Sequence, residues 1–284
     1  PEEARVDLLA AFALGRHVSA DRVLISALVQ FAIENIVASI VAENFYQLPP
    51  DTLTQISDGL KSAPPQGLVA DCIDAENKSF GQYYLRKIEE LRSDDESRPV
   101  ARMRELIAGT LNEEGTPAEE RIAKADKIMA AAGGTLEGLV RLSQELPPLY
   151  EQVQRILRLP AAEYQKPMTE FENMVNAHPN PLVKEFFAVF DNCRKKEFGT
   201  QSTVAMVHAA IAFKLRGEEG LRSVIDPSAG QPFEFERFVF EGVDRGFKLK
   251  SKFRGRDFDE VLIFVEKPGS RFRTTGKRAG ERVK

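Results

Sequence analysis

The chain has 284 residues, of which 43% are hydrophobic and 29% are charged, and its net charge is −4. A chain this long and this apolar can bury a sizeable core, which excludes a protein that is disordered throughout. Its two cysteines exclude a scaffold held together by many disulfides, and its 19 glycines exclude a collagen-like repeat.

The first 220 residues predict one helix after another. Apolar residues within 23–42 form a face broad enough to pack on more than one side. Leu48-Pro49-Pro50 ends this helix, because proline cannot continue the backbone hydrogen bonds. Gly199, which follows two lysines, is expected to end a later helix. Further helices are expected up to Leu60 and near 67–91, 99–110, 117–132, 135–158, 166–177, 180–197 and 201–219.

The pattern changes to short strands after Gly220. Apolar residues alternate with charged ones in 233–240 and in 247–251, a loop is expected over Gly242–Gly246, and 261–265 forms a third apolar run. Three strands this short are not stable alone, so they should pack on the helices. The predicted fold class is therefore mainly α, an irregular multi-helix domain with a small C-terminal three-stranded antiparallel β-meander packed on it. The expected segments are a helical domain at 1–220, a β segment at 221–266 and a basic flexible tail at 267–284.

Charge is distributed unevenly along the chain. Residues 241–284 hold 13 Lys or Arg against 7 Asp or Glu, a net charge of +6, so the remainder carries −10. This asymmetry is typical of a tail that binds a partner or an anionic surface. A solvated chain end is the alternative.

The most apolar stretch, Val23–Ala42, has polar residues near its middle. Gln30, Glu34 and Asn35 are costly at membrane depth, so we interpret the stretch as a core helix and expect no membrane span. Glu34 should pair with an Arg or Lys of another helix, and a ligand pocket is the alternative. No secretory signal is visible, but the chain begins at Pro1 and not Met, so removal of a signal or anchor stays open.

Cys72 and Cys193 lie in runs that predict helices, and for each a buried free thiol is favoured over a disulfide between them. The three histidines and two cysteines show none of the close spacings of a zinc site. No nucleotide, phosphate-loop or serine-nucleophile motif occurs either. We therefore assign no catalytic, cofactor-binding or metal residue, expect no cofactor, and expect no specific nucleic-acid binding.

His208 lies in the middle of a predicted helix among apolar residues. A buried, hydrogen-bonded histidine is the favoured interpretation. The alternative is a catalytic base, which needs a carboxylate partner such as Glu34 or Glu76.

Two parts of the chain resemble a known group of proteins. One is 8–42, with Leu14-Gly15-Arg16-His17. The other combines Asp226-Pro227-Ser228-Ala229-Gly230-Gln231-Pro232-Phe233 with Gly246-Phe247-Lys248-Leu249-Lys250-Ser251. They are similar to uncharacterised, mostly helical bacterial proteins that are exported or membrane-anchored and carry a C-terminal D-P-x-x-G-x-P segment followed by G-[FY]-x-L-x-S. The second part also resembles the C-terminal region of some pseudopilin-like proteins, in which a Phe stands where this chain has Ser228. The resemblance implies a periplasmic or cell-envelope location and transfers no catalytic residue; a cytoplasmic location stays open.

Three functions remain as hypotheses. The first is a non-catalytic helical protein of the cell envelope or periplasm that binds a protein partner. The second is a hydrolase that uses His208 with a carboxylate in a pocket between helices. The third is attachment to an anionic surface through the basic tail at 267–284, which salt would weaken.

Overall fold

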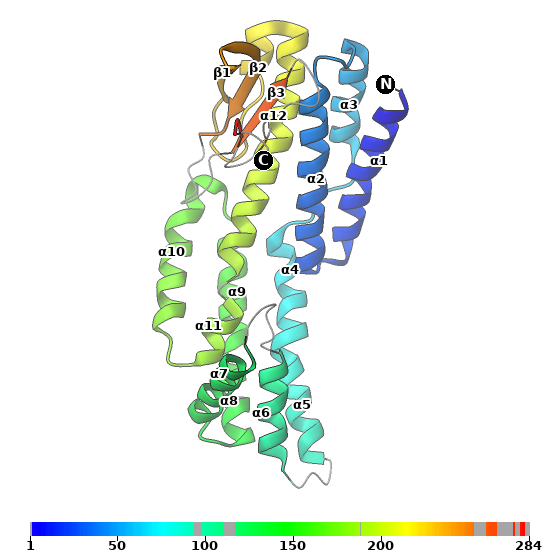
Figure 1. The fold of residues 1–284 in the computed structure, drawn as a ribbon. Helices are drawn as coiled ribbons and strands as arrows, with labels where there is room; N and C mark the ends of the chain where they lie inside the picture. The colour runs from blue at the N-terminus through cyan, green and yellow to red at the C-terminus, as the bar shows by residue number, and fades with distance from the viewer. Residues whose placement is uncertain are drawn as a thin grey trace. The chain divides into compact units, whose positions relative to one another are not determined.

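The computed structural model describes residues 2–93, 98–110, 117–187, 189–252, 260–265, 275 and 279–281. These residues form a mainly helical chain with a three-stranded antiparallel sheet near the C-terminus, which confirms the predicted fold class (Figure 1). The α-helices are α1 (Glu2–Val18), α2 (Leu24–Asn44), α3 (Pro50–Ser62), α4 (Val69–Glu76), α5 (Gln82–Ser93), α6 (Pro99–Thr110), α7 (Ala118–Ala131), α8 (Leu136–Gln144), α9 (Leu146–Leu157), α10 (Ala161–Ala177), α11 (Pro181–Phe187) and α12 (Phe190–Arg222). The strands are β1 (Glu234–Phe240), β2 (Val243–Lys250) and β3 (Val261–Val265).

Residue contacts divide the chain into two compact units. The first unit comprises Pro1–Val69, Leu159–Gln165 and Asn192–Lys284, and the second comprises Ala70–Arg158 and Lys166–Asp191. The sheet therefore belongs to the same unit as α1, α2, α3 and most of α12. The segment boundaries at residues 220 and 266 stay a prediction, and most of the tail at 267–284 lies outside the described residues.

The core of the first unit lies between the helices and one face of the sheet. Phe45, at the end of α2, packs edge-on against Phe264 of β3 with ring centroids 5.0 Å apart. Phe247 of β2 stacks on Phe264 at 4.9 Å. All three rings are buried, as are Phe12 of α1 and Ile56 of α3. The sheet thus obtains from the helices the apolar partner that three short strands need.

The sheet is a simple meander in the order β1-β2-β3, with both pairs antiparallel. Glu241 and Gly242 join β1 to β2, and both have positive φ, 53° and 76°. Two such residues make the tight hairpin turn whose twist matches that of the flanking strands. The predicted loop over Gly242–Gly246 was therefore wrong, because β2 already begins at Val243.

The prediction that Gly199 ends a helix was also wrong, since α12 continues through this residue to Arg222. A Cβ at position 199 would lie 2.4 Å from Oε1 of Glu260, just before β3. The glycine therefore makes room for this partly buried side chain instead of ending the helix. The non-helical residue within α12 is Gly217, with φ 64°.

The second unit is built from helices around an aromatic centre. Tyr150 of α9 packs against Phe187 of α11, with ring centroids 4.6 Å apart, and Phe171 of α10 packs against Phe187 at 5.7 Å. The side chain of Asn180 donates a hydrogen bond to the carbonyl of Leu142 at 2.8 Å, which ties the start of α11 to α8. In the region predicted as one helix over 67–91, α4 and α5 are joined by a π-helical turn, Asn77–Gly81.

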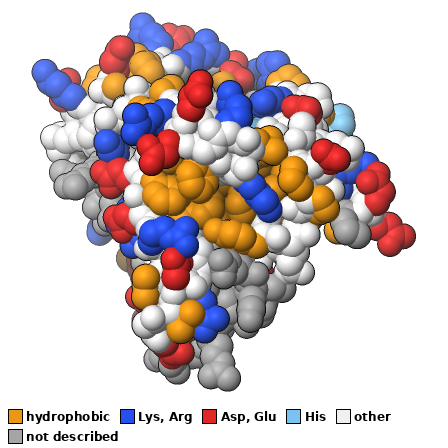
Figure 2. Space-filling model, turned by 90° about the horizontal axis from the view of Figure 1, so that it is seen from above, with side chains coloured by type: hydrophobic (Ala, Val, Ile, Leu, Met, Phe, Trp, Pro, Cys, Tyr) orange, Lys and Arg blue, Asp and Glu red, His pale blue; other side chains and the backbone are white. Residues whose placement is uncertain are grey.

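The surface carries charged, uncharged polar and apolar side chains. Seen from above, hydrophobic side chains gather in one area, with Lys, Arg, Asp and Glu side chains around it (Figure 2). Large hydrophobic side chains that are exposed include Leu14, Ile25, Ile36 and Val239.

Candidate functional site

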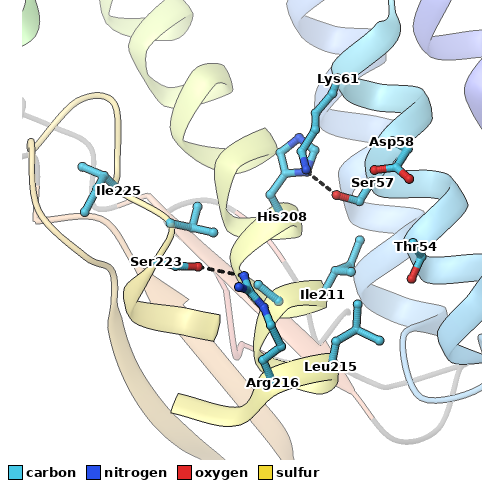
Figure 3. A pocket seen from close by; sticks show the side chains of 12 residues that line it. Thr54, Ser57, Asp58, Lys61, His208, Ile211, Leu215, Arg216, Ser223 and Ile225 are labelled. Atoms are coloured by element: carbon cyan, nitrogen blue, oxygen red, sulfur yellow. Dashed lines mark hydrogen bonds between the residues drawn. The ribbon is translucent and has the colours of Figure 1, made fainter. Parts of the chain in front are cut away.

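His208 is hydrogen-bonded to a serine of a different helix. Ser57 lies on the inner side of α3 and is buried, and His208 lies on the facing side of α12 and is partly buried. Oγ of Ser57 and Nδ1 of His208 share a hydrogen bond of 2.9 Å (Figure 3). The favoured prediction was a buried, hydrogen-bonded histidine: the hydrogen bond is present, but the side chain is only partly buried because it lines a pocket.

A pocket of about 620 Å³ opens beside the Ser57–His208 pair, within the range of about 300–1,000 Å³ of small-molecule sites. Its floor is apolar, because Ile211 and Ala212 of α12 are buried there and Val224 is partly buried. Its rim is more polar and exposed. The rim residues are Thr54, Asp58 and Lys61 of α3, Leu215 and Arg216 of α12, and Ser223 and Ile225 of the segment after α12.

Two cations face this pocket from opposite helices. Lys61 reaches along the imidazole of His208, while Nη2 of Arg216 donates a hydrogen bond to Oγ of Ser223 at 2.9 Å (Figure 3). Within the described part of the chain, neither cation forms an ion pair with a carboxylate. Asp58 is the one carboxylate among the lining residues.

The surroundings of His208 keep its ring neutral. Burial lowers the pKa of His208 to about 4, and the positive charges of Lys61 and Arg16 act in the same direction. The negative charge of Asp58 opposes them but is the weakest of these influences. At pH 7 the ring is therefore an uncharged hydrogen-bonding group.

Glu34, one of the carboxylates considered as a partner for His208, is engaged elsewhere. It is almost completely buried in α2, and its Oε1 accepts hydrogen bonds from Arg16 Nε at 3.0 Å and Gln30 Nε2 at 2.8 Å. The expected pairing with an Arg of another helix is thus confirmed. Burial raises the pKa of Glu34, and the Arg16 guanidinium counteracts this effect. Glu76, the other carboxylate considered, belongs to the second unit.

The Arg16–Glu34 pair also fixes a stretch of backbone. Nη1 of Arg16 donates to the carbonyl of Pro64 at 2.7 Å, and Oε1 of Gln30 accepts from the backbone N–H of Gly67 at 2.9 Å. These contacts provide partners for partly buried backbone groups between α3 and α4. The geometry therefore supports a structural role for Glu34.

The remaining candidates are not assembled into a site. Cys72 and Cys193 are both buried free thiols, as predicted. His17 is exposed, and Nδ1 of His178 accepts a hydrogen bond from the backbone N–H of Asn180 at 3.2 Å. Among the described residues, no group of three or more His, Cys, Asp or Glu side chains is placed to hold a metal ion.

Asp226, Ser202, Ser228 and Ser251 meet in a buried polar cluster. Oδ1 of Asp226 accepts hydrogen bonds from the hydroxyl of Ser202 at 2.8 Å and from the backbone N–H of Ser228 at 2.9 Å. Oδ2 of Asp226 accepts one from the hydroxyl of Ser251. We name these four residues the Asp226 cluster. It links α12, the segment after it and the end of β2. Its hydrogen bonds therefore stabilise the packing of these three parts against one another.

The exposed side of α2 is entirely apolar. Five residues of this helix are exposed: Ile25, Val29, Ala32, Ile36 and Ile40. Among the helices that the structure describes, α2 is the one long and apolar enough to cross a membrane, with a mean hydropathy of 1.9, although 39% of that window is buried in the protein. Length and composition alone do not separate such a span from the core helix of a soluble protein.

Sequence reasoning identified His208 but missed Ser57, Asp58 and Lys61. Their spacing in α3 places Ser57 and Lys61 on one face, four residues apart, which is the signal that was available. Nothing in the sequence showed that this face would meet α12. Comparisons of the chain with protein-family models, curated proteins and solved structures found no match.

Proposed function

We propose that this chain is a non-catalytic protein that binds an α-helix of a partner protein on the exposed side of α2. We call this surface, formed by Ile25, Val29, Ala32, Ile36 and Ile40, the α2 face. The observation that carries the proposal is that every exposed residue of α2 is apolar. Ile25 is 64% exposed and Ile36 is 58% exposed, so these large side chains contact solvent extensively. Contiguous apolar surfaces of this kind mark interaction sites.

The spacing of the α2 face suits a helix as its partner. Its members follow one another at intervals of four, three, four and four residues, which is close to the seam through which two helices pack. From Ile25 to Ile40 the seam is about 22 Å long at 1.5 Å per residue. A partner helix of four turns would cover it.

The charges of α2 favour a protein over a lipid surface. Helices that lie on membranes carry Lys and Arg beside their apolar side, and α2 contains neither residue. Its two charged residues are Glu34, which is buried against Arg16, and Glu43 near its end. Depletion of charge at the centre is instead typical of protein interfaces.

The properties of His208 support a function without catalysis. A general base is most effective when its pKa lies near the working pH, and the pKa of His208 is lowered to about 4. In the described residues, no carboxylate is hydrogen-bonded to the second ring nitrogen to orient it, as such bases require.

The cell-envelope or periplasmic location is supported by the sequence resemblance alone. Fractionation of the native host with an antibody against the chain tests it. A signal in the cytoplasmic fraction only would contradict this part of the proposal.

Site-specific photo-crosslinking in the native host tests the α2 face. A benzoylphenylalanine at position 29 should form a crosslink to one protein, whereas the same group at Asp51, an exposed residue of α3, should not. The substitution Ile36→Glu lies on the same face of α2, seven residues or two turns from the crosslinker, and should abolish the crosslinked band. The purified variant should unfold at the same temperature as the wild type, since residue 36 is exposed.

The crosslinking experiment also distinguishes a partner protein from other molecules that could cover the α2 face. A crosslink to a second copy of the chain, or to lipid, would contradict a partner protein. So would a crosslink at position 29 that survives Ile36→Glu, or equal crosslinking from positions 29 and 51.

A hydrolase remains the second candidate because of one observation, the 2.9 Å hydrogen bond between Ser57 and His208 beside a pocket. In this reading Ser57 is the nucleophile and His208 its base. Hydrolysis of p-nitrophenyl esters by the wild type, and its loss in Ser57→Ala, would favour this function. Equal rates for the two proteins would exclude it for this substrate class.

A further inference from the structure

The pocket beside His208 combines an apolar floor with uncompensated positive charge. Lys61 and Arg216 contribute two positive charges and Asp58 one negative charge, while the ring of His208 is neutral at pH 7. The lining therefore carries one excess positive charge. A ligand that neutralises it has a single negative charge, and a ligand that covers Ile211 and its neighbours has an apolar body.

We propose that this pocket binds an amphiphilic carboxylate. The carboxylate lies against the ammonium group of Lys61, beside the hydroxyl of Ser57 and the ring of His208. The hydrocarbon chain lies over Ile211 and Ala212 and passes under Ile225. This inference is independent of the α2 face, because none of the pocket residues belongs to α2.

The end of the pocket at Lys61 suits the carboxylate of the ligand better than the end at Arg216. The guanidinium of Arg216 already donates to Ser223, whereas within the described residues Lys61 has no hydrogen-bond or ion-pair partner. When the hydroxyl of Ser57 donates to Nδ1, the ring proton of His208 resides on Nε2, which is a second donor for an anion. His208 and Arg216 are eight residues apart on α12, about 12 Å, which leaves room for an apolar chain between the two ends.

Isothermal titration calorimetry with sodium decanoate tests the proposal on the full chain. Saturable binding with one site is expected, and Lys61→Met should weaken it at least tenfold. Lys127→Met, which removes an exposed lysine of α7 in the second unit, is the matched control and should bind as the wild type does. Acetate lacks the chain and 1-decanol lacks the charge, so each should bind at least tenfold more weakly than decanoate.

Nuclear magnetic resonance of the wild-type protein with isotope-labelled histidines locates the ligand without any substitution. Decanoate should shift the ring resonances of His208 and leave those of His17 and His178 unchanged, with His208→Gln assigning the signal. Absence of saturable binding, equal binding by the Lys61→Met and Lys127→Met variants, equal affinity for decanol, or an unmoved His208 signal would each overturn the proposal.

Discussion

The hydroxyl of Ser251 donates a hydrogen bond to Oδ2 of Asp226, across 25 positions of the sequence. This bond joins the turn that begins at Asp226 to the end of strand β2. Between them, Phe247 and Leu249 point into the core, while Lys248 and Lys250 point outward. The alternation of apolar and charged residues in 247–250 therefore belongs to strand β2. The residue that follows it, Ser251, connects the strand through Asp226 to Ser202 of α12.

Ser251→Ala should lower the free energy of unfolding by about 1–3 kcal/mol, because it leaves a buried acceptor of Asp226 without one partner. Ser202→Ala removes the other hydroxyl donor and should have a similar effect. Since both bonds end on one carboxylate, the double variant should deviate from additivity by at least about 0.5 kcal/mol. Urea unfolding measures all three. If the losses of unfolding free energy are small and strictly additive, the hydrogen bonds of the Asp226 cluster do not act cooperatively.

Gly199→Ala tests the close approach of Glu260. An alanine inside a helix normally stabilises it by about 1 kcal/mol relative to glycine. At position 199 its Cβ would lie 2.4 Å from the carboxylate of Glu260, so the end of this side chain must move and we expect the usual gain to be lost or reversed. Gly109→Ala in α6 is the matched control, because nothing lies within 4 Å of its Cβ, and it should be stabilising. The same sign at both positions in thermal unfolding would contradict the steric explanation.

The helices and strands could be predicted because their signals are local. Proline stops, apolar periodicity and alternation around Phe247 need no knowledge of distant residues. Gly199 was misread because its local context, two lysines and a glycine, is that of a helix end, whereas its actual partner is Glu260, 61 positions later. The start of β2 was misplaced because Glu241 adopts a positive φ that the sequence alone rarely signals.

The candidate site was less predictable than the fold for the same reason. The isolation of Glu34 in an apolar helix did predict a cationic partner, and Arg16 fulfils that role. The pocket, by contrast, depends on the meeting of α3 with α12, whose residues 57 and 208 are 151 positions apart. No local pattern contains that contact.

Arg16→Met should be strongly destabilising, by about 3–5 kcal/mol at pH 7, because it leaves the buried charge of Glu34 without its cation. The pKa of Glu34 is already raised by burial, and loss of Arg16 raises it further. Protonation at lower pH then removes the unpaired charge, so the deficit of the variant should shrink as the pH falls toward 5. Arg16→Met combined with Glu34→Gln should recover part of the loss at pH 7. Urea unfolding of the wild type and the two variants at pH 7 and pH 5 measures this, and a deficit independent of pH would show that packing of Arg16 matters more than its charge.

The histidine of the pocket should make folding sensitive to mild acid. The pKa of His208 is about 4 in the folded protein and about 6.5 when the chain is unfolded, because burial first, and then Lys61 and Arg16, disfavour the charged ring. Above pH 6.5 the ring is neutral in both states and has no effect. Between pH 6.5 and 4 the unfolded state binds the proton more tightly, so stability falls as the pH falls, by at most about 3 kcal/mol in total.

His208→Gln isolates this contribution, since glutamine can still form a hydrogen bond with Ser57 but does not titrate. Glu34 and Glu260, whose pKa values burial raises, titrate in both proteins and cancel in the comparison. The difference in unfolding free energy between wild type and variant should be constant from pH 8 to 7 and then shift against the wild type down to pH 4.5. Parallel curves over the whole range would mean that the ring of His208 is as easily protonated in the folded protein as in water, and that burial does not keep this ring neutral.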